Sequence, residues 1–211
     1  ERYGFATPQD VGKTIAEATA EKEKAIEASR SNNADIDIPV RPGLAYLPFQ
    51  KAGIAYALQR DATLIGDEMG LGKTIQALGY INAQSDIQSI LVVCPASLKL
   101  NWAREAEKWL VRKYSIGIAK STNVPDTGVV IINWDILKKN LETLQSRRFD
   151  LLIADEMHYA KSRFFPVYNS LTVGAELQAV EALKFIIHLG RNIHITSLTN
   201  RIFYRYYCNS F

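Results

Sequence analysis

The run from Thr63 to Gln76 constrains this chain more than any other segment, because a short apolar stretch leads into a turn with two glycines. The turn ends in Gly-Lys-Thr, and a helix-forming sequence follows. Glycines let successive backbone N–H groups point into one concavity that binds phosphate oxygens, and the positive end of the next helix adds attraction. The lysine can reach the β- and γ-phosphates, and the threonine hydroxyl can bind Mg²⁺. The sequence therefore predicts a nucleoside triphosphate site, with nucleotide-binding residues Gly70, Gly72, Lys73 and Thr74.

One departure and one decoy bear on this prediction. The strict phosphate-loop pattern has a glycine where this chain has Asp67, although Gly66 lies beside it. A second Gly-Lys-Thr triplet begins at Gly12, but no glycine closely precedes it and no apolar strand leads into it. The residues that follow, 15–29, are rich in Ala, Glu and Lys and are typical of a solvated helix. We therefore place the phosphate site at Lys73.

Size and composition set broad limits on the class of protein. The chain has 211 residues, of which 47% are hydrophobic and 22% charged, which suits one large α/β domain or a domain with appendages. A net charge of +3 is too small to indicate nucleic-acid binding by itself. The two cysteines, Cys94 and Cys208, fit neither a metal-ligand spacing nor a disulfide framework. No apolar run is long enough to span a membrane and no signal peptide opens the chain, so we expect an intracellular protein.

The chain divides into an N-terminal helix and linker over residues 1–43 and an α/β domain over residues 44–211. Residues 8–31 predict the helix, and the linker contains one short extended piece at 36–40. Within the domain, apolar strands alternate with helices, which predicts a mostly parallel sheet with helices on both faces. We expect strands at 62–66, 89–94, 115–119, 128–132, 150–154 and 193–195, and helices at 49–60, 73–83, 98–112 and 134–144.

A second half of the site follows the strand at 150–154, which ends in Asp155 and Glu156. Ligands of parallel sheets bind beyond the carboxyl ends of the strands, where the glycine turn also lies. Asp155 would hold Mg²⁺, directly or through water, and Glu156 would orient and deprotonate the attacking water. Acids are also common where a strand end meets solvent, but a phosphate loop upstream favours the catalytic interpretation.

These residues carry a resemblance to a known family. Asp67 to Gln76 resembles motif I of the Swi/Snf-type DNA translocases of helicase superfamily 2, a family that often has Asp at the position noted above. Four further stretches resemble its motifs in the same order: the Q motif at 47–53, motif Ia at 91–102, motif Ib at 130–137, and a DEAH-type motif II at 155–161 with Met157 in place of the usual Ala. The nearest branch is the annealing-helicase-like one, including its bacterial and phage members.

The resemblance implies that residues 44–211 form the first RecA-like P-loop lobe of a two-lobe motor. Such a lobe is part of a DNA-dependent ATPase that uses ATP and Mg²⁺ to move on duplex DNA. Its catalytic residues would be Lys73 and Glu156, its metal ligands Thr74 and Asp155, and its adenine contact Gln50. His158 would couple the ATP site to the DNA site.

The implied DNA contacts are Ser97, Lys99 and Asn133, which would lie near the phosphate backbone. A helix cap and a solvated lysine are the structural alternatives for the first two, and a hydrogen-bonded structural histidine is the alternative for His158. Trp102 and Trp109 have helical spacing, and we expect them to pack in the core and not to stack on bases. Partners would be DNA and a second RecA-like lobe, with no membrane. The protein would be cytoplasmic or nucleoid-associated in bacteria or phage, and nuclear in eukaryotes.

The resemblance weakens after Lys161. The family has a Thr-Gly-Thr-Pro motif III after the next strand, where residues 196–199 have Thr-Ser-Leu-Thr. Either residues between ordered segments are omitted from the sequence, or the motif has decayed. Because the second lobe supplies arginines that stabilise the transferring phosphoryl group, we expect weak ATP binding and little or no hydrolysis from these 211 residues. Two other functions stay open: a non-motor nucleotide-binding interaction module, and an RNA helicase of the same superfamily.

Overall fold

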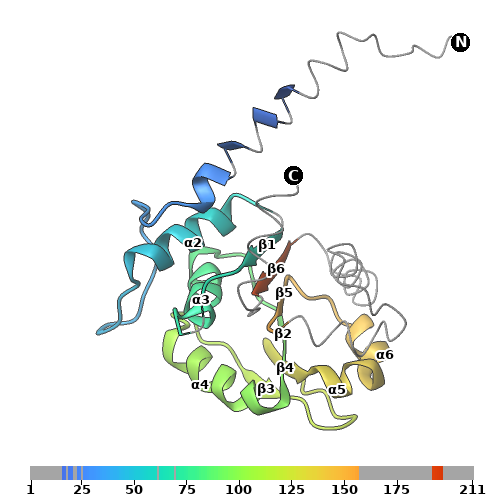
Figure 1. Ribbon diagram of the computed structural model, residues 1–211. Helices are drawn as coiled ribbons and strands as arrows, with labels where there is room; N and C mark the ends of the chain where they lie inside the picture. The colour runs from blue at the N-terminus through green and yellow to red at the C-terminus, as the bar shows by residue number, and fades with distance from the viewer. Residues whose placement is uncertain are drawn as a thin grey trace, which may run out of the picture.

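The computed structural model describes residues 16–17, 19–20, 23–24, 26–60, 62–68, 70–156 and 192–196 (Figure 1). The described residues between 16 and 29 are helical, as the sequence predicts; residues 8–15 of the expected helix lie outside the described residues. A six-stranded parallel sheet follows, with the order β1-β6-β5-β2-β4-β3. The strands are β1 (Ala62–Ile65), β2 (Ile90–Cys94), β3 (Ile116–Ile118), β4 (Val129–Asn133), β5 (Leu151–Ala154) and β6 (Asn192–Thr196). All expected strands form, and the prediction of a parallel sheet is confirmed.

Strands β2, β4 and β5 are buried at every position, and all their residues except Asn133 are apolar, because both faces of the sheet are covered. Alternate residues of one strand enter two separate cores: Ile90 and Val92 pack in the first, and Leu91 and Val93 in the second. Val92 lies between Ile131 of β4 and Ile153 of β5 in register, and all three belong to the first core. The period of two along each strand therefore divides the sheet between two helical layers.

The first layer contains α2 (Pro48–Leu58), α3 (Lys73–Ala83) and α4 (Lys99–Trp109), the last preceded by the 3₁₀ turn η1 (Ala96–Leu98). The second contains α5 (Trp134–Leu137), the 3₁₀ turn η2 (Lys138–Asn140) and α6 (Leu141–Gln145). Figure 1 shows α2, α3 and α4 on one side of the sheet and α5 and α6 on the other. Helices on both faces are thus confirmed.

The helix expected over 134–144 is broken, and Asn140 explains the break. Its buried amide Nδ2 donates to the carbonyl oxygens of Ile136 (2.8 Å) and Ser121 (2.7 Å). An asparagine that bonds nearby backbone groups competes with helical hydrogen bonding, and Asn140, the last residue of η2, has φ of −111° and ψ of 12°, outside the α-helical region. The chain therefore changes from α5 through η2 to α6.

The helix expected over 98–112 ends early, at Trp109, because tertiary contacts capture the next residues. Leu110 is extended, and its carbonyl accepts a hydrogen bond from Arg41 Nε at 2.6 Å. The Val111 N–H donates to the buried Asn82 Oδ1 at 3.0 Å. Residues 36–40 form no strand, but Ile38 is buried in the first core. The segment before α2 is thereby held against α3 and α4.

Candidate nucleotide site

The predicted phosphate loop connects β1 to α3 and depends on two glycines. Gly70 and Gly72 have φ angles of 86° and 75°, the left-handed region that side chains disfavour. Gly72 is also the N-cap of α3, and a Cβ atom there would lie 2.6 Å from Gln50 Nε2. The backbone therefore needs glycine at both positions, and Gly72 needs it for space as well.

Lys73 lies inside this loop. Its side chain is 4% exposed, and Nζ donates to the carbonyl oxygens of Asp67 and of Glu68, the latter at 2.7 Å. Burial lowers the pKa of Lys73, and the negative charges of Asp67, Glu156 and Asp155 oppose that shift. The ammonium thus donates to backbone oxygens of the loop the same hydrogen bonds that it could donate to phosphate oxygens.

Gln50 connects α2 to the phosphate loop. Its buried side chain accepts a hydrogen bond from the Leu47 N–H at 3.0 Å and donates one to the Leu71 carbonyl at 3.2 Å. The predicted adenine contact is therefore beside the loop, and its amide is satisfied by backbone groups on both sides.

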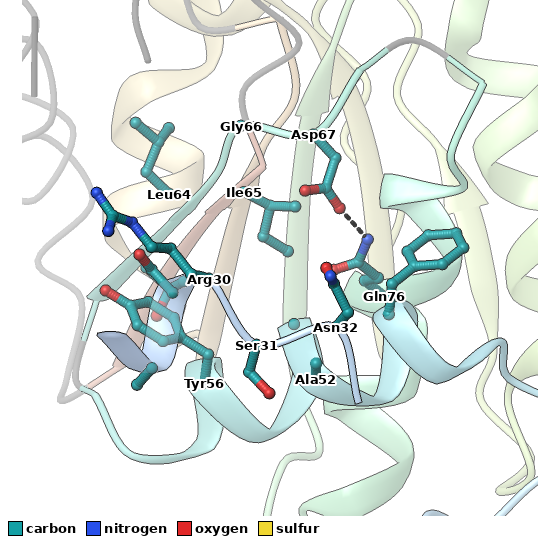
Figure 2. A pocket seen from close by; sticks show the side chains of 15 residues that line it. Arg30, Ser31, Asn32, Ala52, Tyr56, Leu64, Ile65, Gly66, Asp67 and Gln76 are labelled. Atoms are coloured by element: carbon teal, nitrogen blue, oxygen red, sulfur yellow. Dashed lines mark hydrogen bonds between the residues drawn. The ribbon is translucent and has the colours of Figure 1, made fainter. Parts of the chain in front are cut away.

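The residue that departs from the strict pattern, Asp67, has a structural partner that the sequence analysis missed. Its Oδ2 accepts a hydrogen bond from Gln76 Nε2 at 2.5 Å, which Figure 2 shows as a dashed line. Gln76 belongs to the second turn of α3 and is buried. A carboxylate at the start of the loop thus holds the beginning of α3, the helix that follows the loop. An Asp and a Gln flanking the glycines were the only sequence signals of this contact.

The two residues line a cavity of about 400 Å³ at the β1 edge of the sheet. Residues 28–32 and one face of α2, including Ala52 and Tyr56, form its other walls (Figure 2). The cavity places the segment after the N-terminal helix beside the start of the phosphate loop.

The acidic pair follows β5, which is separated from β1 by the single strand β6. All three strands are parallel, so their carboxyl ends share one edge, and two strand spacings amount to about 10 Å. The structure thus brings the phosphate loop and the acidic pair to the same edge of the sheet, at the carboxyl ends of its strands. The influence of Asp155 and Glu156 on the pKa of Lys73 reflects this arrangement.

Asp155 is almost fully buried, and hydrogen bonds fix it at several atoms. Its N–H donates to the Val93 carbonyl at 2.8 Å, its Oδ2 accepts from Trp102 Nε1 at 2.8 Å, and its carbonyl accepts from Trp134 Nε1 at 2.9 Å. Burial raises the pKa of Asp155, while the Trp102 bond, the Glu156 backbone N–H and Lys73 lower it. The carboxylate is therefore held in one orientation.

Glu156 has a left-handed backbone, with φ of 52°, which is rare for a residue with a side chain and is common at functional sites. Burial and the neighbouring Asp155 carboxylate raise the pKa of Glu156 to about 7, and Lys73 opposes that shift. A general base works best when its pKa lies near the operating pH. The chemistry of this carboxyl group therefore suits proton abstraction from water.

The available ligand atoms suit Mg²⁺, which also binds substrate phosphates, better than a metal ion that protein side chains hold alone. Among the described residues, no three His, Cys, Asp or Glu side chains are grouped so that they could hold a metal ion. Mg²⁺ commonly uses one or two protein oxygens together with substrate phosphates. The Asp155 carboxylate and the half-exposed Thr74 hydroxyl supply such oxygens.

The three predicted DNA contacts lie on η1, α4 and β4. Lys99 Nζ donates to Asn133 Oδ1 at 2.9 Å and to the Ala119 carbonyl at 3.1 Å, so the fold brings two of them together. Ser97 is exposed on η1. Asn133 is buried and ends β4, at the same edge of the sheet as the phosphate loop. His158, the predicted coupling residue, lies outside the described residues.

Trp102 and Trp109 both pack in the first core, as the sequence analysis predicts. The bond from Trp102 to Asp155 was not predicted. Indole is a donor only, and a buried indole N–H usually finds an acceptor, but spacing along the chain does not indicate which one.

Taken together, the parallel sheet, its helical layers and a glycine loop at the carboxyl edge define a RecA-like α/β domain. The SNF2-related domain matches residues 49–171, more than half of the chain, and the chain belongs to this family. It is 39% identical over 128 residues to the Bos taurus DNA annealing helicase and endonuclease ZRANB3, covering 56% of this chain and 12% of the relative. It is 28% identical over 165 residues to the Gallus gallus DNA repair and recombination protein RAD54B, covering 65% and 18%.

A solved structure supports the fold. The Sulfolobus solfataricus SWI2/SNF2 ATPase core in complex with dsDNA has a TM-score of 0.56 and 20% identity, covering 74% of this chain and 32% of that one. The chain spans about an eighth of the length of ZRANB3 and about a fifth of the length of RAD54B. Within the part of the chain that the structure describes, no helix has the length and apolar character needed to cross a bilayer.

Proposed function

We propose that this chain is the ATP-binding lobe of a DNA-dependent ATPase of the Swi/Snf helicase-like family, which couples ATP hydrolysis to movement on duplex DNA. One observation carries the proposal: a glycine loop with a buried lysine and an acidic pair meet at the same edge of one parallel sheet. Membership of the SNF2-related family supports it. The likeness to ZRANB3 supports the annealing-helicase-like branch; bacterial or phage membership stays a prediction.

In the proposed site, Gly70, Gly72 and the start of α3 bind the phosphates through backbone N–H groups. Lys73 exchanges its two loop carbonyls for phosphate oxygens, which are anionic and form stronger hydrogen bonds. Gln50 lies beside the loop, where its amide would contact adenine.

Thr74 and Asp155 would hold Mg²⁺, which would supply positive charge to the phosphate oxygens as the bond to the leaving group breaks. Glu156 orients the attacking water and accepts its proton, a role that its raised pKa suits. Further positive charge would come from a second RecA-like lobe, so we expect the 211 residues alone to hydrolyse ATP weakly or not at all.

The proposed DNA contacts are Ser97, Lys99 and Asn133, at the carboxyl ends of β2 and β4. Contacts to phosphates are insensitive to sequence and weaken as salt concentration rises. His158 would connect the ATP site with the DNA site. A protein with this activity is intracellular, nuclear in a eukaryote and cytoplasmic or nucleoid-associated in bacteria or phage.

DNA-stimulated ATP hydrolysis by the full-length protein tests the proposal. We expect duplex DNA to stimulate hydrolysis, and Lys73→Ala and Glu156→Gln each to abolish the stimulated rate. A protein that binds ATP but shows no DNA-stimulated turnover would be the non-motor interaction module, which Met157 and the sequence at 196–199 favour. Stronger stimulation by RNA than by duplex DNA would indicate an RNA helicase.

A further inference from the structure

Two buried tryptophans converge on Asp155 from opposite faces of the sheet. Trp102 belongs to the first core and is 1% exposed, and Trp134 belongs to the second and is 2% exposed. The Trp102 indole donates to the side-chain Oδ2 of Asp155, and the Trp134 indole donates to the backbone carbonyl of the same residue. One aspartate is thus fixed at its side chain by α4 and at its backbone by α5.

These bonds act on different degrees of freedom of the aspartate. A hydrogen bond to one carboxylate oxygen limits rotation of the side chain and leaves the other oxygen for a second partner. A bond to the carbonyl holds the peptide plane between Asp155 and Glu156, where φ of Glu156 is already 52°. The two indoles therefore constrain the metal-ligating carboxylate and the backbone that orients the proposed base.

The same two tryptophans lie next to the proposed DNA contacts. Lys99 is one helical turn before Trp102 in α4, and Asn133 directly precedes Trp134. The bond between Lys99 Nζ and Asn133 Oδ1 joins these two segments a second time. The residues that would meet the DNA backbone are thus connected through short, packed segments to both indoles.

We propose that Trp102 and Trp134 are positioning residues that hold Asp155 in the orientation in which it ligates Mg²⁺ with bound nucleotide. The inference rests on the proposed function, because it takes Asp155 as the metal ligand. It assigns to two residues of the hydrophobic core a role in the geometry of the nucleotide site.

The chain offers a matched control for Trp102. Trp109 lies two turns further along α4 and is buried in the same core, and its indole Nε1 has no hydrogen-bond partner among the described residues. Trp102→Phe and Trp109→Phe remove the same atoms from the same core, but only the first removes a bond to Asp155. Any difference between the two variants therefore reports on that bond.

The first measurement is the affinity for a fluorescent ADP analogue with Mg²⁺ and with EDTA. We expect Trp102→Phe to weaken the affinity in Mg²⁺ about tenfold, as for loss of a hydrogen bond to a charged group, and to leave the affinity in EDTA unchanged. Trp109→Phe should match the wild-type chain in both. Two results would mean that Trp102 has only a packing role and would overturn the proposal. One is an equal loss of affinity in Trp102→Phe and Trp109→Phe; the other is a loss of affinity for Trp102→Phe that is as large in EDTA as in Mg²⁺.

The second measurement uses the unaltered chain, so it does not depend on a variant that folds. The three indole N–H resonances are assigned by triple-resonance NMR on the isotopically labelled wild-type chain and followed as Mg²⁺ and ADP are added. The Trp102 and Trp134 signals should shift, and the Trp109 signal should stay in place. Unmoved Trp102 and Trp134 signals in a chain that binds Mg²⁺·ADP would refute the positioning role.

Failure of the proposed function gives a different result. A wild-type chain whose ADP affinity is the same in Mg²⁺ and in EDTA, and is unchanged by Asp155→Asn, would refute both the metal-binding role and the inference. A Mg²⁺-dependent affinity that Asp155→Asn abolishes and Trp102→Phe does not affect would refute the inference alone.

Discussion

Lys73 Nζ donates a hydrogen bond to the carbonyl oxygen of Glu68 at 2.7 Å, so the lysine at the start of α3 closes the loop that precedes it. The same Nζ donates to the Asp67 carbonyl, and the side chain is 4% exposed. A buried cation usually requires a partner of opposite charge or several acceptors. Here neutral carbonyls serve as acceptors, and the carboxylates of Asp67, Asp155 and Glu156 add favourable charge. Replacing these carbonyls by phosphate oxygens would give the lysine anionic acceptors.

The Lys73→Ala variant should bind ATP at least about tenfold more weakly than the wild-type chain, because hydrogen bonds to charged groups contribute about 1.5–3 kcal/mol. Titration with a fluorescent ATP analogue measures the effect. Lys51→Ala removes the same charge from a half-exposed position of α2 and should leave the affinity unchanged. An equal effect of both substitutions would place the phosphate site elsewhere.

Alanine at the two loop glycines should have unequal effects. Both have left-handed φ angles, so either alanine introduces backbone strain of about 1 kcal/mol or more. A Cβ atom at Gly70 would meet no atom of the described residues within 4 Å, whereas one at Gly72 would lie 2.6 Å from Gln50 Nε2 and 3.2 Å from Ile75 Cδ1. We expect Gly72→Ala to lower the free energy of unfolding more than Gly70→Ala and to break the bond from Gln50 to Leu71, as denaturant titration would measure. A larger loss from Gly70→Ala would contradict this account.

The raised pKa of Glu156 predicts how stability depends on pH in the absence of nucleotide and metal. Between about 4.5, the ordinary pKa, and about 7, the folded pKa, the folded chain binds more protons at this group than the unfolded chain does. Glu156 should therefore favour the folded state at low pH and lose that contribution as pH rises through 7. Urea unfolding in EDTA should show a shallower fall in stability from pH 5 to pH 8 for Glu156→Gln than for the wild-type chain. Glu107→Gln, on the exposed face of α4, is the control and should retain the wild-type slope.

Lys99 provides a test of the proposed DNA surface in the full-length protein. If its ammonium meets a phosphate, Lys99→Ala should weaken binding to all duplex sequences equally and reduce the slope of log affinity against log salt by about 1. Lys108→Ala removes the same charge from an exposed position in the last turn of α4 and should leave the slope unchanged. If Lys99 serves only to bond Asn133 and Ala119, its replacement will lower stability without changing the salt dependence.

Local sequence signals were sufficient for much of the fold. The bounds of α3 agree at both ends with the prediction, because Gly72 supplies the left-handed residue before the helix and apolar residues recur on its buried face. The apolar strands β2, β4 and β5 were recognisable because each is covered on both faces. The prediction failed where a distant residue intervened: Asn140 bonds Ser121 and interrupts the helix at 134–144, and Asn82 holds Val111 and ends α4.

The sequence by itself determined the parallel α/β architecture and the position of the glycine loop, because hydrophobic period, glycine and proline act over a few residues. Only the tertiary structure decided that Trp102 and Trp134 would meet Asp155, which lies 53 residues after Trp102 and 21 residues after Trp134. That meeting depends on which strands become neighbours in the sheet, since β5 pairs with β2 on one side and with β6 on the other. The charges around Lys73 were decided in the same way: its two carbonyl acceptors belong to its own loop, but Asp155 and Glu156 come near it only because the loop and the end of β5 share an edge.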